Sequence, residues 1–257
     1  MKNLFFEYYK IDEEEWNKIS KNSSQKFKKL FWKIPYEKYQ VLLDDDIEKV
    51  YKKGKINELV KALMNKMGTL RISYIFLTYY YNLGIPDDKW CISPGKNGSS
   101  IQYFPDFEEK HFYIHYFFNF WAEVFYIKFF SIIDIICDLL NNYYEMGIKK
   151  ETKGFRRKVI KNLKKENLEL FKFLENIKNK REYKNAKEFR NRIIHSIPAY
   201  EISNQNEIKK YENKIVEIKF GAGKYTKSSE IKENAEEVLI LLKNIFEKLK
   251  ENLNFDD

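Results

Sequence analysis

The sequence predicts an all-α protein built as an antiparallel helical bundle. Only 9 of its 257 residues are glycine and 5 are proline, which is too few for the many turns of an all-β fold. The clearest helical pattern lies near the end of the chain, where apolar residues recur in steps of four and three from Ile231 to Leu249. Several such segments without internal repeats or long linkers favour a bundle of neighbouring helices.

The chain changes character near residue 55. Residues 1–55 are rich in charged and aromatic side chains and carry acidic runs at 12–15 and 44–46, so we expect an N-terminal extension of short helices. Residues 56–257 are expected to form the bundle as one compact unit. Its first helix covers 56–83 and ends at a Gly-Ile-Pro stop.

Loop and helix signals alternate through the middle of the bundle. Prolines and glycines predict a loop over 85–105, and a long aromatic helix over 106–146 follows it and is closed by a glycine. A helical stripe of apolar residues covers 155–178. A shorter helix is expected over 184–197, where a proline stops it.

A small extended insertion precedes the last helix. Polar and apolar residues alternate from Val216 to Thr226 around Gly221 and Gly223, which predicts a hairpin. We expect the last helix to begin at a serine cap, at residue 228 or 229.

Basic residues outnumber acidic ones 47 to 38, which gives a net charge of +9 and a pI near 9.1. Such a balance favours a polyanionic partner. The excess is concentrated between Lys149 and Arg192, where 17 Lys or Arg stand against 6 Asp or Glu. We expect a basic face that binds phosphates without reading sequence, and the alternative is a solvated helix pair. The residues expected to bind phosphates there are Arg156, Arg157, Lys158, Lys164 and Lys165.

Cysteine usage and hydropathy indicate a cytoplasmic protein without a membrane contact. The two cysteines have no Cys-x-x-Cys partner, which excludes a disulfide scaffold and a four-cysteine zinc site. The most apolar stretch, 111–137, is interrupted by Glu123, Lys128 and Asp134. It therefore predicts a buried helix rather than a membrane span.

Two motifs suggest a bound group but lack essential residues. Residues 221–224 (GAGK) resemble a phosphate-binding loop without its first glycine and without the Ser or Thr after the lysine. Glu108 and His111 have the spacing of a di-iron helix, yet no second Glu-x-x-His is present. His111 and His115 could share one metal ion, whereas a polar, hydrogen-bonded face is the interpretation that we prefer. We expect no cofactor.

Residues 190–195 (RNRIIH) carry the candidate chemistry. The apolar stripe of this helix is expected to be Ala186, Phe189, Ile193 and Ile197. Asn191 and His195 are four residues apart and point away from that stripe, and Arg190 and Arg192 flank them. An imidazole can move a proton near neutral pH, and a guanidinium stabilises an anionic phosphorus centre. The alternative is a histidine that only complements the helix dipole.

This pattern, R-N-x-x-x-H on a short helix after a long aromatic helix and before a capped last helix, resembles the HEPN superfamily. HEPN domains are α-helical bundles of prokaryotic toxins, CRISPR-associated ribonucleases and other defence proteins. Their hallmark is an Arg four to six residues before a His, commonly with a polar residue after the Arg. Arg190, Asn191 and His195 match it, and the resemblance covers 56–257 as a stand-alone prokaryotic branch.

The resemblance implies a metal-independent endoribonuclease in a toxin or defence role. His195 would act as general base or acid, Arg190 would hold the scissile phosphate, and Asn191 would orient phosphate or imidazole. Arg192 and the basic face would contact the RNA backbone. It also implies a homodimer, with an antitoxin or a nucleotidyltransferase-like protein as a further candidate partner. Other members lack activity, so a non-catalytic dimerisation, nucleotide-binding or partner-binding module is the alternative.

Overall fold

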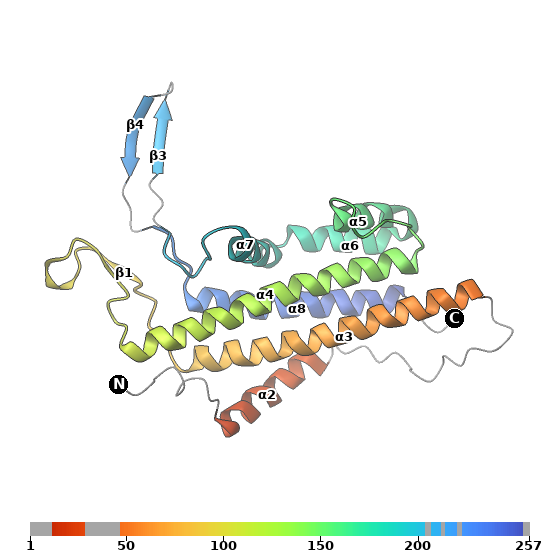
Figure 1. The fold of residues 1–257 in the computed structure, drawn as a ribbon, viewed down its shortest axis with the longest axis horizontal. Helices are drawn as coiled ribbons and strands as arrows, with labels where there is room; N and C mark the ends of the chain where they lie inside the picture. Colours follow the sequence, from red (N-terminus) through yellow and green to blue (C-terminus); the bar gives the residue numbers. More distant parts are fainter. Residues whose placement is uncertain (1–11, 29–46, 204–206, 212–213, 220–222, 254–257) are drawn as a thin grey trace.

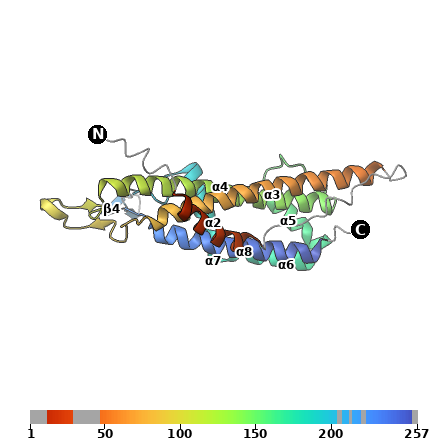
Figure 2. The same ribbon diagram turned by 90° about the horizontal axis from the view of Figure 1, so that it is seen from below.

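Three long helices run side by side along the molecule and form its body (Figure 1; Figure 2). They are α3 (Ile47–Asn82), α4 (Glu109–Tyr143) and α8 (Ser228–Asn252), and α3 runs opposite to the other two (Figure 1). The computed structural model describes residues 12–28, 47–203, 207–211, 214–219 and 223–253. Those residues form seven α-helices and only short strands, so the predicted all-α fold is confirmed.

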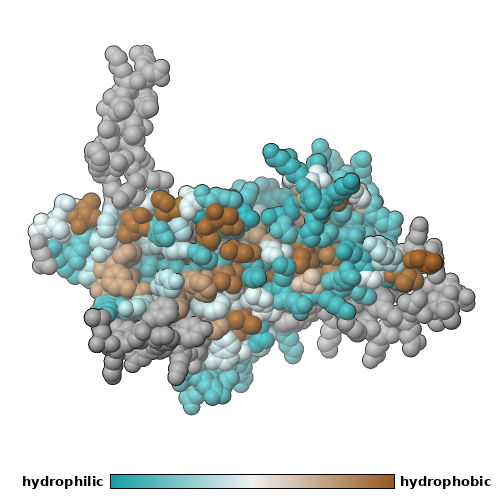
Figure 3. Space-filling model, in the orientation of Figure 1, coloured by the Kyte–Doolittle hydropathy of each residue, from teal (hydrophilic) through white to brown (hydrophobic). Residues whose placement is uncertain are grey.

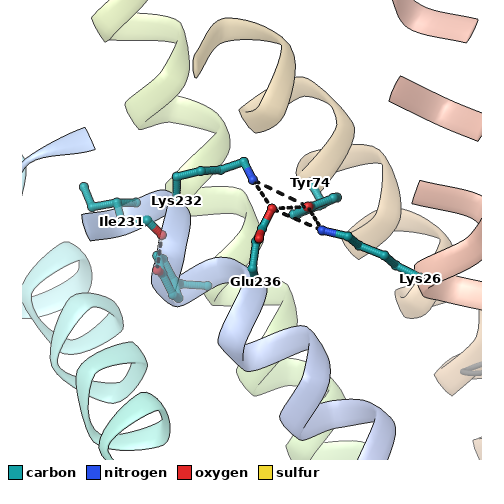
Figure 4. A network of polar contacts seen from close by, with 6 residues as sticks. Lys26, Tyr74, Ile231, Lys232 and Glu236 are labelled. Atoms are coloured by element: carbon teal, nitrogen blue, oxygen red, sulfur yellow. Dashed lines mark hydrogen bonds and ion pairs between the residues drawn. The ribbon is translucent and has the colours of Figure 1, made fainter. Parts of the chain in front are cut away.

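The helix α2 (Glu13–Lys28) packs against α3 and is tied to the body by a polar network (Figure 4). Lys26 Nζ donates to the Tyr74 hydroxyl at 2.8 Å and lies 3.1 Å from a Glu236 oxygen, which Lys232 also approaches at 2.5 Å. Burial alone would raise the pKa of Glu236, but hydrogen bonds from Lys232, Tyr74 and Lys26 lower that pKa to about 2. One carboxylate thereby joins α2, α3 and α8.

Three shorter helices cover the side of the long helices that faces away from α2 (Figure 1). They are α5 (Phe155–Glu166), α6 (Leu168–Asn179) and α7 (Arg181–His195). The single stripe predicted over 155–178 is therefore two helices. The break falls at Asn167, whose Oδ1 accepts a hydrogen bond from the Leu170 amide at 2.9 Å and caps α6.

The irregular segment before α4 contains a minimal hairpin, β1 (Cys91–Ile92) with β2 (Gln102–Tyr103). A second hairpin, β3 (Glu207–Tyr211) with β4 (Lys214–Lys219), projects from the bundle after α7 (Figure 1). The hairpin predicted at 216–226 is thus misplaced. Residues 216–219 pair with the strand before them, and the expected turn glycine Gly221 lies outside the described residues.

Several helix boundaries differ from the sequence-based expectation. The helix α4 is three residues shorter at each end than expected, and α7 begins three residues earlier, at Arg181. Three further differences concern α3, α7 and α8. The helix α3 begins at Ile47, so the division expected between residues 55 and 56 falls inside one continuous helix. The helix α7 ends at His195 rather than at residue 197. The last helix has Lys227 at its N-cap without a side-chain cap, and Asp87 from a distant loop accepts a hydrogen bond from the Ser228 amide at 2.7 Å instead.

The core explains the high aromatic content of the chain. Its largest fully buried side chains come mainly from α3, α4 and α8, and include Tyr80, Tyr126, Phe118, Phe129 and Phe246. The apolar length of α4 is buried against these neighbours. No helix within the described residues is long and apolar enough to cross a membrane.

Candidate active site

The helix α7 is held against α4 and α8 by aromatic and polar contacts. The Tyr183 ring packs 5.6 Å from that of Phe130, and the Phe189 ring packs 5.3 Å from that of Tyr126. Asn234 of α8 donates to the Glu182 carbonyl at 3.1 Å. These contacts fix the rotation of α7, so its opposite face points to solvent.

The end of α7 is stabilised by Arg192. Its Nε donates to the Ile197 carbonyl at 3.1 Å and its Nη2 to the Pro198 carbonyl at 3.2 Å. The chain turns after His195, and Ile197 is therefore exposed rather than part of the buried stripe as predicted. The structure thus places Arg192, expected to contact RNA, on the turn that ends the helix.

Arg190, Asn191 and His195 lie on the solvent side of α7. Arg190 is partly buried and donates from Nη1 to Asn191 Oδ1 at 3.2 Å. Asn191 and His195 are exposed and line one shallow depression, whose other charged lining residues are Lys184, Lys187, Glu188 and Arg192. Arg190 lines a neighbouring groove, and Asn191 borders both surfaces. The carboxamide therefore connects the guanidinium side of the motif with the imidazole side.

That groove, here called the basic groove, runs between α4, α5, α6 and α7. Its basic lining residues are Lys150, Lys153, Arg156, Arg157, Lys178, Lys184, Lys187 and Arg190. Asp134 is the one acidic side chain among the described lining residues, and the remaining walls are largely apolar. Figure 3 shows a mainly hydrophilic surface over α5 and α6. A groove lined by this many basic side chains attracts phosphates.

The predicted phosphate-binding residues separate into different environments. Arg156 pairs with Asp134, Nε to Oδ1 at 2.5 Å, and lies over the Phe130 ring at 5.7 Å from its centroid. Arg157 lines the basic groove and is exposed. The lysines at 158, 164 and 165 are exposed on α5, outside the groove lining.

Sequence reasoning missed five lysines that line the groove. Lys150 and Lys178 form ion pairs with Asp138 and Glu175, and the other three are Lys153, Lys184 and Lys187. No ion pair within the described residues involves Lys153, Lys184 or Lys187. The spacing of Lys184, Lys187 and Asn191 places them on one helical face, so the sequence carried that signal. Lys153 lies in the turn before α5 and lines the groove because α5 packs on α4.

Burial also shapes the electrostatics of the groove floor. It raises the pKa of Asp134, and the nearby guanidiniums of Arg156 and Arg190 oppose this shift only in part. It raises the pKa of the Cys137 thiol to about 12, so this cysteine stays protonated at neutral pH. The groove therefore keeps its positive character without an ionised thiol beneath it.

The two histidines of α4 have separate hydrogen-bond partners. His111 Nδ1 accepts from the Glu108 amide at 2.9 Å, as part of the cap of α4. His115 Nε2 lies 2.9 Å from the Tyr225 hydroxyl, which donates to Asp87 at 2.6 Å. Across the described ranges, no three His, Cys, Asp or Glu side chains gather in a way that could hold a metal ion.

Comparison with known families supports the resemblance. The model of the Cthe2314-like HEPN family matches residues 59–250. The chain belongs to the HEPN superfamily. No curated protein and no solved structure matches this HEPN protein. The matched region contains Arg190, Asn191 and His195 together with the whole basic groove, whereas α2 precedes it.

Proposed function

We propose that this HEPN protein is a metal-independent endoribonuclease that acts in a toxin or defence role in the cytoplasm. One observation carries the proposal: the motif residues Arg190, Asn191 and His195 face solvent on α7, directly beside the basic groove. A single-stranded RNA in that groove would bring its phosphates to Arg190 and its ribose to the imidazole. Family membership supports a ribonuclease-like or nucleotide-related role in general.

The proposed reaction is an internal transphosphorylation. The His195 imidazole of one copy takes the proton of a ribose 2′-hydroxyl, and that of the second copy in the proposed dimer gives a proton to the leaving 5′-oxygen. An imidazole can do either near neutral pH. The 2′-oxygen bonds to phosphorus while the bond to the 5′-oxygen breaks. Arg190 stabilises the charge that develops on the phosphate, and Asn191 holds Arg190 in place. The products are a 2′,3′-cyclic phosphate and a 5′-hydroxyl.

The test is cleavage of single-stranded RNA by the purified full chain in the presence of EDTA. His195→Ala and Arg190→Ala should each lower the rate by about 10²–10⁴-fold, the usual worth of a positioned acid, base or oxyanion donor. RNA with a 2′-deoxyribose at the scissile position should stay intact, because the attacking oxygen is missing.

A matched histidine variant completes this test. His111→Ala removes an imidazole of α4 that lies outside the motif, and it should leave cleavage unchanged. Inhibition by EDTA together with loss of activity in His111→Ala would favour the metal alternative at His111 and His115. Intact RNA after prolonged incubation with the wild type would favour a non-catalytic module.

A further inference from the structure

An aromatic pocket lies on the N-terminal half of α4, beside the segment that follows α7. Its walls include Phe112, Tyr116 and Phe120 of α4, with Phe104 and Tyr200. The cavity volume is about 570 Å³, which is within the range of small-molecule sites. None of these residues takes part in the proposed cleavage step. We call this cavity the aromatic pocket.

The rings of the aromatic pocket are arranged as a platform for stacking. Phe112, Tyr116 and Phe120 follow each other at intervals of four residues, so they lie one turn apart on one helical face, and all three are exposed. Figure 3 shows apolar surface over this half of α4. Phe104 adopts φ +48°, a strained conformation for a bulky residue, and its ring packs 5.7 Å from that of His115. Strain of this kind is concentrated at binding sites.

The polar groups of the aromatic pocket favour a ligand that donates hydrogen bonds. Glu123 and Glu201 line it, and no described lining residue is Lys or Arg. Tyr200 donates its hydroxyl to Glu123 Oε1, which leaves the other carboxylate oxygen without a partner in the described part of the chain. Asn119 also lines the pocket and is only 6% exposed, and its Oδ1 is buried with no hydrogen-bond partner among the described residues.

The aromatic pocket and the candidate active site are close along the chain. Tyr200 is five positions after His195 in the chain, so their Cα atoms lie within about 18 Å of each other. That span corresponds to a few nucleotides of a single strand. We propose that the aromatic pocket binds an unstacked guanine base of the RNA substrate, an inference that rests on the proposed ribonuclease function. Aromatic side chains stack such bases in many single-strand binders.

The choice of guanine follows from hydrogen-bond complementarity. Guanine presents N1–H and N2–H as two parallel donors, which match the two oxygens of a carboxylate such as Glu123. Each carboxylate oxygen has two acceptor sites, so Oε1 can receive one of these donors beside the Tyr200 hydroxyl. Uracil and adenine present fewer adjacent donors, and a phosphate group would be repelled by Glu123 and Glu201. A guanidinium group offers a similar donor pair, so an arginine side chain of a protein partner is the competing occupant.

The experiment measures nucleoside binding to the full-length His195→Ala variant by titration calorimetry, with guanosine, inosine, adenosine and N-acetylarginine amide as probes. Guanosine should bind, and inosine, which lacks the N2 amino group, should bind about tenfold more weakly or worse. Glu123→Gln and Phe120→Ala should each weaken guanosine binding by about tenfold or more. Phe120 is exposed, so its replacement should leave the melting temperature unchanged.

Two control variants test whether the effects on guanosine binding are specific to the aromatic pocket. Glu109→Gln and Tyr51→Ala alter an exposed carboxylate and an exposed ring elsewhere, and should not change guanosine binding. Equal binding of all nucleosides, no guanosine binding, or preference for the arginine probe would each overturn the guanine assignment. Free nucleosides bind without being cleaved, so these results are independent of ribonuclease activity. If the protein bound guanosine but left RNA intact, the proposed ribonuclease function would be wrong, while the guanine-binding site would stand.

Discussion

Arg192 donates a hydrogen bond from its Nε atom to the carbonyl oxygen of Ile197, at 3.1 Å, and a second from Nη2 to the Pro198 carbonyl. Both carbonyls belong to the turn that follows α7, so this guanidinium holds the turn against the last turn of the helix. Arg190, two residues earlier, instead lines the basic groove. Two arginines that look alike in the sequence therefore have different surroundings.

This difference predicts opposite effects of two alanine substitutions. Arg192→Ala should lower the free energy of unfolding by about 1 kcal/mol, because two carbonyls lose a charged donor at a largely solvated site. The melting temperature should fall by about 2–4 °C, and RNA affinity should stay close to that of the wild type. Arg190→Ala should leave the melting temperature unchanged and abolish cleavage. If Arg192→Ala weakened RNA binding without a change in stability, Arg192 would be an RNA contact after all.

His115 predicts a pH dependence of stability. Burial lowers the pKa of its imidazole from 6.5 to about 4, opposed only partly by Asp87. Between these values the unfolded chain binds a proton that the folded chain does not, so stability rises with pH. The free energy of unfolding should therefore fall by about 3 kcal/mol as the pH is lowered from about 7 to 4.

Urea denaturation at several pH values checks this expectation, with His115→Gln as the matched variant. The variant should lack the loss between pH 6.5 and 4. Glu236, whose pKa is lowered to about 2, contributes stability that is lost only below its ordinary value of 4.5, as the pH approaches 2. A wild-type curve parallel to that of His115→Gln would show that His115 is not buried as a neutral group.

The long helices could be predicted because their apolar periodicity ends at glycine and proline stops. The division of 155–178 into α5 and α6 could not, since Leu163 and Leu170 remain seven residues apart across Asn167 and keep the apolar stripe in phase. The hairpin was misplaced for a similar reason. The prediction placed the turn at the glycines at 221 and 223. It missed the first strand, Glu207–Tyr211, because this polar segment shows no apolar alternation.

The candidate site was predictable where its residues share one helix. Arg190, Asn191 and His195 lie on the expected face of α7, and Lys184 extends that face by two turns. Contacts between distant segments were not predictable. Tyr225 and Asp87, which engage His115, are 138 residues apart, and no local pattern relates them.

Asn167 predicts a measurable cost of breaking the α5–α6 junction. Its Oδ1 caps α6, and its Nδ2 donates to the Tyr144 hydroxyl and to Asn252 Oδ1. Asn167→Ala should lower the free energy of unfolding by about 1–2 kcal/mol through loss of the cap. Asn167→Asp keeps the cap acceptor but loses both donors, so its loss should be smaller. Equal urea midpoints for the wild type and Asn167→Ala would contradict this role.

The basic groove predicts how RNA affinity depends on salt. Each phosphate contact on a single strand contributes about 0.7 to the slope of log affinity against log salt. Replacing Lys153, Arg157, Lys184 and Lys187 by alanine should therefore reduce that slope by up to about 3. The matched control removes four exposed lysines of α5 outside the groove, at 158, 161, 164 and 165. An equal reduction by the control would place the RNA on the outer face of α5, and a flat wild-type slope would exclude both surfaces.

The apolar residues around His195 predict a homodimer. Ile194 is 44% exposed and Ile197 also faces solvent, so two isoleucines flank the imidazole at the surface. Burying them against a second copy would remove apolar area from water and bring two motifs together. Light scattering at micromolar concentration should give twice 31.3 kDa for the wild type, and Ile194→Asp with Ile197→Asp should give the monomer mass. Ile240→Asp, at a position on α8 that is 62% exposed, should remain dimeric. If the wild type were a monomer, or if Ile240→Asp alone dissociated it, the contact would not involve the face that carries His195.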